Sequence, residues 1–198
     1  MIYEALQILK EQLENYFDEV GLGKNIILDN VALWESGSKD ADRLDGKVIF
    51  TLLKIEEELT LKNSPSVKVV NGKSEYFNPP VNLSLYLLVS ANCSSYDISL
   101  NSISRTIEFF QGKNIFTSSN TVYNRSNPSF HPIGHFKFVV ELFTPGFEVF
   151  NHIWGTLGGR QLPSALYKIH IIEITRDKKL AAGELITHIS GTLNDIEP

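Results

Sequence analysis

The sequence predicts an α+β fold in which a mainly antiparallel sheet packs with about three helices. Segments with the spacing of a helix alternate with segments of strand length, in the order helix, strands, helix, strand, helix, strands. The chain has 198 residues, a length that suits one hydrophobic core. We therefore expect a single domain over residues 1–198, large enough to fold without a disulfide or a bound metal.

The N-terminal helix has the clearest pattern. It begins at Ile2, and we expect Gly21 and Gly23 to end it, because glycine readily adopts the left-handed conformation of a helix C-cap. Its apolar residues recur at three- and four-residue spacing: Ile2, Leu6, Leu9, Leu13, Phe17 and Val20. The apolar run Ile26–Leu33 then has strand length, and the polar tract Glu35–Gly46 is typical of a loop.

Two further strands are predicted in the middle of the chain. Val48–Ile55 is mostly apolar and rich in β-branched residues, and three glutamates follow it. Between Val81 and Leu87 apolar and polar residues alternate, which indicates a half-buried strand. The tract Asn63–Pro80 between them contains three prolines and a glycine, so we expect a long excursion or an extended arm there.

A second helix is expected to begin near Ser95, with Asp97 placing negative charge in its first turn. The residues Gln111–Asn114 should end it. Its apolar residues at helical spacing predict a buried stripe: Tyr96, Leu100, Ile103, Ile107 and Phe110. The polar, turn-rich tract Thr117–Gly134 is predicted to be a second long loop.

The last third of the chain contains the remaining elements. Phe136–Phe143 alternates like a strand, and Phe147–Leu157 is a short apolar helix that a glycine pair ends. A strand over Ala165–Ile174, a charged turn and a last strand-like segment, Gly183–Ser190, complete the prediction.

Composition and charge exclude several classes of protein. The net charge of −5 argues against broad, non-specific binding to nucleic acid or to an anionic membrane. The single cysteine, Cys93, excludes an internal disulfide framework and a multi-cysteine zinc site. Charged residues interrupt the first helix, and the longest uncharged stretch, Tyr76–Tyr96, is too polar to cross a bilayer. We therefore expect the chain to fold in the cytoplasm and not to insert into a membrane.

One glycine-rich stretch and one pair of histidines resemble ligand sites only superficially. Gly155–Arg160 is glycine-rich like a phosphate-binding loop, but it follows a helix and precedes a strand, which is the reverse of the required order. His131 and His135 have a spacing that can chelate metal on one helix turn, but Pro132 and Gly134 lie between them. We predict no cofactor and no metal site.

No catalytic set can be assembled either. There is no Gly-x-Ser-x-Gly motif, and Cys93 lies among serines without a local activating base. The run Glu56–Glu58 follows a strand, where consecutive side chains point to alternate faces and do not converge. The long polar loops and the aromatic-rich short helix therefore favour an interaction module over an enzyme.

Several blocks, read in order, resemble a known family. These blocks are Met1–Leu6, Asn30–Leu33, Val48–Glu58, Asn78–Leu88, Ile107–Lys113, Asn151–Gly155 and Gly158–Lys168. Their order resembles the N-terminal domain family of the tail cap, or tail terminator, proteins of extracellular contractile injection systems of the virulence-cassette and antifeeding-prophage type. The resemblance spans roughly Met1 to Ile174.

The resemblance implies a structural role with no catalytic motif. A member of this family is expected to have a fold like that of phage tail terminators and to form a six-fold ring that caps the inner tube and engages the last sheath ring. The implied partners are five further copies of the chain, the inner tube protein and the sheath protein, without a need for nucleic acid. Such a part would be assembled in the cytoplasm and released with its particle.

The residues nominated for partner contacts lie in the most family-like block: Trp154, Arg160, Gln161 and Leu162. Arginine and tryptophan are common interface anchors, although Trp154 fits equally well as a core residue of its short helix. The tracts Asn63–Pro80 and Thr117–Gly134 are candidates to reach a neighbouring subunit or the sheath.

Two other interpretations stay open. The first is a terminator or head–tail joining protein of a phage, which neighbouring capsid and portal genes would indicate. The second is a small cytoplasmic enzyme or ligand-binding domain, which would need a deep pocket with convergent polar groups.

Overall fold

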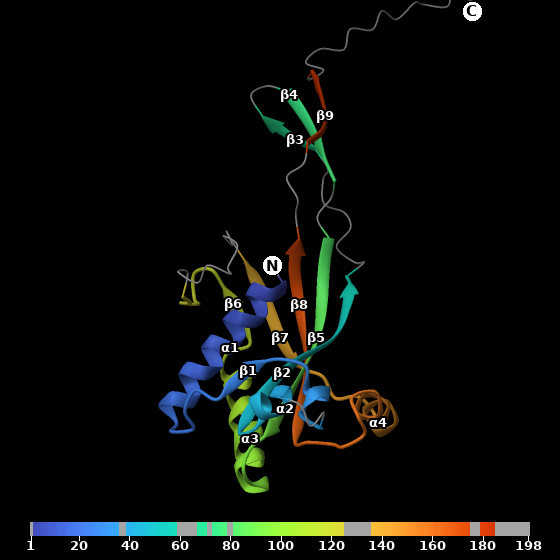
Figure 1. Cartoon of the computed structure of the whole chain (residues 1–198). Coiled ribbons are helices and arrows are strands. Elements are labelled where there is room, and N and C mark those ends of the chain that lie inside the picture. The colour runs from blue at the N-terminus through green and yellow to red at the C-terminus, as the bar shows by residue number, and fades with distance from the viewer. Residues whose placement is uncertain are drawn as a thin grey trace, which may run out of the picture.

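A six-stranded sheet forms the centre of the molecule (Figure 1). The computed structural model describes residues 2–35, 39–58, 67–70, 73–78, 81–124, 136–174 and 179–184. The strands lie in the order β1-β2-β5-β8-β7-β6. Their bounds are β1 (Ile26–Leu28), β2 (Lys47–Glu57), β5 (Val81–Asn92), β6 (Ile115–Thr117), β7 (Lys137–Leu142) and β8 (Ser164–Ile174). β1 pairs with β2 in parallel and the other neighbours in this sheet pair antiparallel, which confirms the predicted α+β class with a mainly antiparallel sheet.

Helices α1 (Ile2–Glu19) and α3 (Tyr96–Gly112) cover one face of the sheet, which we call the inner face. α1 ends as predicted: Gly21 has a φ of 78°, and the amide of Leu22 donates to the carbonyl of Phe17 at 2.8 Å. The inner core combines both helices with the strands, and its fully buried members include Leu9, Leu13, Phe17, Phe50, Leu85, Leu87 and Val89.

The opposite face of the sheet, which we call the outer face, carries α4 (Phe147–Thr156). A second, smaller core lies beneath it, formed by Val31, Leu44, Ile49, Leu88, Trp154 and Leu166. Neighbouring residues of one strand, such as Leu87 and Leu88, belong to different cores because successive side chains point to opposite faces. The two cores are therefore built on the same strands.

The segment between β1 and β2 differs from the prediction. The expected strand over 26–33 is shorter, because Asn30 Oδ1 accepts a hydrogen bond from the Ala32 amide and begins the 3₁₀-helix η1 (Val31–Glu35). The expected loop contains α2 (Lys39–Leu44), a fourth α-helix among the described residues. Burial of Val31 and Leu44 in the outer core holds both elements against the sheet.

α3 has the predicted span, but the prediction of its buried stripe is partly wrong. Its contact face consists of small hydroxyl residues, Ser99, Ser102 and Thr106, whose side chains donate to the carbonyls four residues earlier. These short side chains let the helix lie close to the sheet and to α1. Ile103 and Phe110 are buried as expected, whereas three other residues are exposed by 67%, 44% and 39%: Tyr96, Leu100 and Ile107.

A second, three-stranded sheet lies apart from the first. It has the order β3-β4-β9, with β3 (Val67–Val70), β4 (Lys73–Phe77) and β9 (Lys179–Glu184), and Figure 1 shows it beyond the ends of β5 and β8. The tract Asn63–Pro80 thus contains a hairpin. The last strand begins at Lys179 rather than Gly183, and residues 185–190 of its predicted span lie outside the described residues.

The tract Thr117–Gly134 is described as far as residue 124, and residues 125–134 lie outside the described residues. Its described part is fixed to α1. Gln12 Nε2 donates to the Val122 carbonyl at 2.7 Å, and the carboxylate of Glu11 accepts from the Asn124 amide at 2.9 Å. This part of the predicted loop is therefore packed against the body of the molecule.

Candidate partner-binding surface

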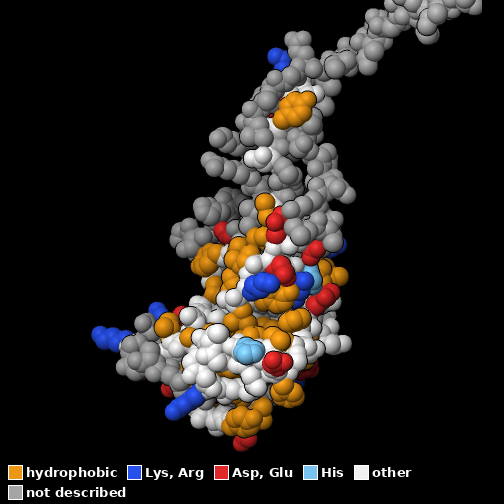
Figure 2. All heavy atoms as spheres, turned by 90° about the vertical axis from the view of Figure 1, so that its right-hand side faces the viewer, with side chains coloured by type: hydrophobic (Ala, Val, Ile, Leu, Met, Phe, Trp, Pro, Cys, Tyr) orange, Lys and Arg blue, Asp and Glu red, His pale blue; other side chains and the backbone are white. Residues whose placement is uncertain are grey.

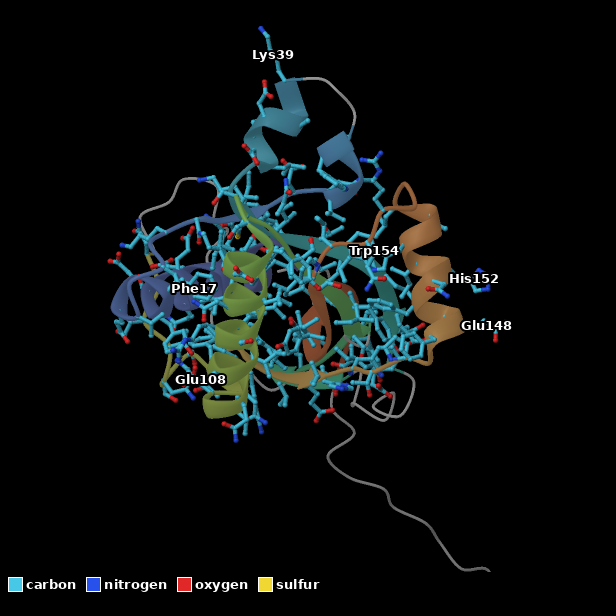
Figure 3. The ribbon with its side chains drawn as sticks, turned by 90° about the horizontal axis from the view of Figure 1, so that it is seen from below. Phe17, Lys39, Glu108, Glu148, His152 and Trp154 are labelled. Carbon is cyan, nitrogen blue, oxygen red and sulfur yellow. The ribbon has the colours of Figure 1, made fainter. Side chains whose placement is uncertain are left out.

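Trp154, the first residue nominated for partner contacts, is 3% exposed. Phe150, Ile153 and Leu157 share its face of α4 and pack on the outer core with it. Figure 3 shows Trp154 pointing from α4 toward the sheet, whereas Glu148 and His152 of the same helix point away. The structure therefore places Trp154 in the core, in agreement with the alternative interpretation of this residue.

The other three nominated residues follow α4 in an exposed turn. Gly159, with a φ of 90°, donates its amide to the Trp154 carbonyl at 2.8 Å and so ends the helix. Arg160 and Gln161 are exposed beyond this turn, while Leu162 is half-buried against the outer core. The order helix, glycine turn, strand is the one that excludes a phosphate-binding loop.

A groove of about 1000 Å³ lies beside α4, which we call the α4 groove. It is built where β1 ends and the second half of β2 continues without it. The first turns of α1 form one wall and α4 forms another. Its apolar lining residues include Tyr3, Leu53, Tyr86, Phe143, Val149 and Ile153.

Hydrophobic side chains are unusually exposed around this groove. Val149 is 52% exposed, Tyr3 42% and Phe143 37%, and Phe147 at the start of α4 is 88% exposed. Figure 2 faces this side of the molecule and shows hydrophobic side chains gathered around α4, with acidic and basic side chains above them. Exposed apolar groups that cluster in this way mark surfaces that bind other proteins.

Charged and polar residues border the groove on the outer face of β2, β5 and β8. Lys54 Nζ lies 2.9 Å from Glu56, and the Tyr86 hydroxyl donates to the same carboxylate at 2.8 Å. The hydrogen bonds from Lys54 and Tyr86 hold the pKa of the Glu56 carboxyl below its ordinary value. Lys168 Nζ lies 5.5 Å from the centre of the Tyr86 ring, so two ammonium groups flank one tyrosine.

The structure also brings together a serine, a histidine and a glutamate that the sequence gives no reason to connect. Ser84 Oγ lies 3.5 Å from His170 Nδ1, and His170 Nε2 lies 3.2 Å from Glu141. Ser84 is only 1% exposed and lies within a strand that pairs on both sides, so a substrate carbonyl has no access to its hydroxyl. We assign these contacts to cross-strand stabilisation of β5, β8 and β7.

The other residues considered for chemistry have separate environments. Cys93 packs beside the inner core with its Sγ 3.7 Å from Ser102 Oγ, and His131 and His135 lie outside the described residues. Within the described ranges, no three histidine, cysteine or acidic residues are grouped as they would be to hold a metal ion. None of the helices described is both long and apolar enough to cross a membrane.

Comparison with known proteins identifies a family. The family model described as "Pvc16 N-terminal domain" matches residues 4–188. No curated protein matches the chain in sequence.

Two solved structures are similar to the chain. One is the sheath/tube terminator of an extracellular contractile injection system (PVC) in the extended state, with a TM-score of 0.63 and 14% identity. That alignment covers 100% of this chain and 64% of the terminator, so the chain spans less than two thirds of that protein's length. The other is the tube-terminating cap of the anti-feeding prophage, with a TM-score of 0.46 and 16% identity, over 74% of this chain and 49% of the cap.

Proposed function

The chain belongs to the Pvc16 N-terminal domain family, and on that premise we propose that it is a structural terminator of a contractile injection particle. In this role it caps the end of the inner tube and contacts the last layer of the sheath. The observation that carries the proposal is the likeness of the whole chain to a protein described as a sheath/tube terminator.

The surface of the described residues supports a binding role without catalysis. The α4 groove is apolar and open, and its exposed aromatic side chains suit a protein partner better than a small polar substrate. Ser84, which faces His170, is buried and gives a substrate no access to its hydroxyl. We therefore propose a non-enzymatic protein that needs no cofactor and no nucleic acid, and that does not insert into a membrane.

A ring is the form that fits this role. Head-to-tail contacts between copies of one chain close into a ring when the rotation between neighbours divides a full turn. A hexameric ring would match a six-fold tube and sheath. We propose that this ring assembles in the cytoplasm and leaves the cell as part of the particle.

Deletion of the gene in the producing cell tests the function. We expect particles with tubes of irregular length and a sheath that is not retained at one end, because nothing stops growth there. A plasmid copy of the intact gene should restore uniform length, and an epitope tag on that copy should be found at one end of the particle by electron microscopy. Particles of normal length and sheath coverage after deletion would refute the proposal.

A further inference from the structure

The α4 groove has walls from both faces of the central sheet. Leu6 and Leu52, which line it, pack with the inner core, whereas Leu53 and Ile153, which also line it, pack on the outer core. Neighbouring residues of one strand point to opposite faces, so a single groove contacts both only where it wraps around the edge of the sheet. The floor of the α4 groove is therefore the edge of β2.

This edge has no neighbouring strand among the described residues. β1 pairs with β2 as far as Phe50, and β2 continues through residues 51–57, whose side toward the groove we call the β2 edge. The Val48 amide donates to the Asn25 carbonyl at 2.9 Å, and the Phe50 carbonyl accepts from the Asp29 amide at 3.1 Å. Alternate residues of β2 thus direct their backbone groups to the side on which β1 lies.

Two residues of the β2 edge direct their amide and carbonyl groups to this side beyond β1. Leu52 continues the alternation. A bulge at Leu53 then shifts the register, and beyond it the Glu58 amide donates to the Asn82 carbonyl of β5 at 2.8 Å. Ile55 lies an odd number of positions before Glu58 and therefore faces away from β5. An extended chain is the occupant that supplies matching N–H and C=O groups to such an edge.

The walls of the groove favour apolar side chains on both faces of this extended chain. Successive side chains of an added strand point alternately toward α1 and toward α4. Leu6 and Leu52 lie on the first side, and Val149 and Ile153 lie on the second. At about 3.3 Å per residue, the seven residues of the β2 edge offer about 23 Å, which is room for a strand of about six residues.

The charged groups that line the groove already have partners. Arg43 Nη2 lies 3.1 Å from the carboxylate of Asp29, and Lys54 Nζ lies 2.9 Å from that of Glu56. A charged side chain of the occupant would lose its hydration here without gaining an ion pair. The groove therefore favours a segment without charged residues.

The chain itself contains a segment of this length and chemistry. Residues 185–190, with the sequence Leu-Ile-Thr-His-Ile-Ser, follow β9 and lie outside the described residues. From residue 185 to residue 194 the sequence contains no aspartate, glutamate, lysine or arginine. Three of the six residues are β-branched, and the sequence analysis predicts them as part of a strand.

β9 directs this segment away from the groove of its own chain. Lys179 pairs with Phe77, at the end of β4 that leads into β5, whereas Glu184 pairs with Lys73 at the other end. Figure 1 shows β9 running away from the central sheet. The residues after Glu184 therefore begin at the far end of the small sheet, where another copy of the chain is the nearer source of a groove.

We propose that residues 185–190 of one copy of this chain add as a strand to the β2 edge in the α4 groove of the next copy. This assignment deepens the proposed function and rests on it for the closed ring. A head-to-tail contact uses two different surfaces of each copy, and the segment and the groove are such a pair. The added strand takes the place beside β2 that β1 leaves open, and its side chains contact α1 and α4.

A fluorescent peptide of residues 184–194 tests this contact by anisotropy on the full-length chain. The receptor carries Ile189→Lys, so that its own segment does not compete. We expect the peptide to bind, and Val149→Glu in the receptor to weaken binding at least ten-fold, because a carboxylate would be buried in the groove. His152→Glu, on the outward side of the same helix, should change affinity less than two-fold. Failure of the peptide to bind, or equal effects of the two receptor variants, would overturn the assignment.

Two methylated peptides distinguish strand pairing from apolar contact alone. One carries backbone N-methyl groups at residues 185, 187 and 189, and the other at residues 186, 188 and 190. Only one edge of an added strand faces β2, so we expect one peptide to lose at least ten-fold in affinity and the other to bind much like the unmodified peptide. Equal affinities of the two peptides would rule out strand addition.

Native mass spectrometry of the full-length chain tests the contact between copies. Ile189→Lys and Val149→Glu should each weaken self-association at least ten-fold, whereas Ile196→Lys, which lies beyond the segment, should not. A one-to-one mixture of the first two variants retains one intact segment and one intact groove, so it should form dimers and no larger species. A mixture without dimers contradicts the proposal.

If the wild-type chain is monomeric at the concentrations tested, cross-linking in assembled particles decides. A chain with Cys93→Ser, Ile189→Cys and Val149→Cys, treated with a short bismaleimide, should give a ladder of linked copies, and the two single-cysteine chains should not. Linkage within one chain, or no linkage, refutes the assignment to the next copy. If these particles are still correctly terminated, the proposed function survives that failure, whereas normal particles after gene deletion refute the function and leave the peptide result standing.

Discussion

Trp154 lies beneath α4 with 3% of its surface exposed, although tryptophan is a residue type that protein interfaces favour. The helical spacing of Phe150, Trp154 and Leu157 turns this side chain toward Ile49 and Leu88 of the sheet. Its indole nitrogen has no hydrogen-bond partner among the described residues. The contribution of Trp154 is therefore apolar contact, which ties α4 to the outer face.

Replacing Trp154 should lower the stability of the fold and not only weaken partner binding. We expect Trp154→Ala to lower the free energy of unfolding by about 3–5 kcal/mol, since it leaves a large cavity under α4. Urea unfolding followed by circular dichroism measures the change.

The matched control is Phe147→Ala on the same helix, where the side chain is 88% exposed. Its free energy of unfolding should stay within about 0.5 kcal/mol of the wild type. Equal effects of the two substitutions would show that Trp154 is not a core residue in solution.

At the scale of the element, α3 shows how a helix can be fixed by its smallest side chains. Ser95 caps its N-terminus by accepting from the Ile98 amide at 3.3 Å. Ser99, Ser102 and Thr106 then form the face against the sheet and α1. A larger side chain on this face would push the helix away from both.

Two serines of α3 give a matched pair for this prediction. Ser102 and Ser104 both donate to the carbonyl four residues earlier at 2.8 Å, but Ser102 is fully buried and Ser104 is exposed. We expect Ser102→Leu to destabilise the fold by about 1–3 kcal/mol through overpacking, and Ser104→Leu to change stability by less than about 0.5 kcal/mol. Chemical denaturation of both variants checks this, and a stable Ser102→Leu would contradict the close packing of α3.

The sequence predicts the positions of helices and strands better than it predicts which face of each one is buried. The long amphipathic α1, the strand β5 and the glycine that ends α1 follow from local patterns, and the structure confirms them. The predicted half burial of β5 is wrong, because this strand is buried on both faces, with Ser84 1% and Leu88 0% exposed. The apolar spacing of α3 predicts a buried side that is partly exposed, because a period identifies a stripe of residues but not what covers it. η1, α2 and the β3–β4 hairpin lie in polar tracts whose packing depends on residues distant in sequence.

The α4 groove is harder still to predict from the sequence. Its lining residues come from α1, β1, β2, β5, β8, α4 and the segments that follow β1, β7 and α4. They meet where β1 ends and β2 continues past it. The contact of Ser84 with His170 likewise spans 86 positions along the chain. The contact roles of Arg160, Gln161 and Leu162 stay predictions, and the structure adds only their position in the turn after α4.

At the scale of the whole molecule, the two cores share one set of strands. Ile49 and Phe50 of β2 belong to the outer and inner core, as do Leu88 and Leu87 of β5. Loss of the central sheet would therefore remove both cores together. We expect one cooperative unfolding transition for the six-stranded sheet and its helices.

Side chains of the wild-type chain can report the unfolding of each core separately. Trp34 and Trp154 pack on the outer core, and Cys93 packs beside the inner core. We expect tryptophan fluorescence and the alkylation of Cys93 to change with the same urea midpoint at one chain concentration. Earlier alkylation of Cys93 would show that the inner core opens by itself.

The strand order of the central sheet has a consequence for synthesis on the ribosome. β8 lies between β5 and β7 in the sheet, although it follows both in the sequence. Until β8 is translated, on the order of seconds to ten seconds after β5, the nascent chain carries a β5 strand with one unpaired edge. Such an edge can pair with any other extended chain, so chaperone contact during translation matters most in the interval between these two strands.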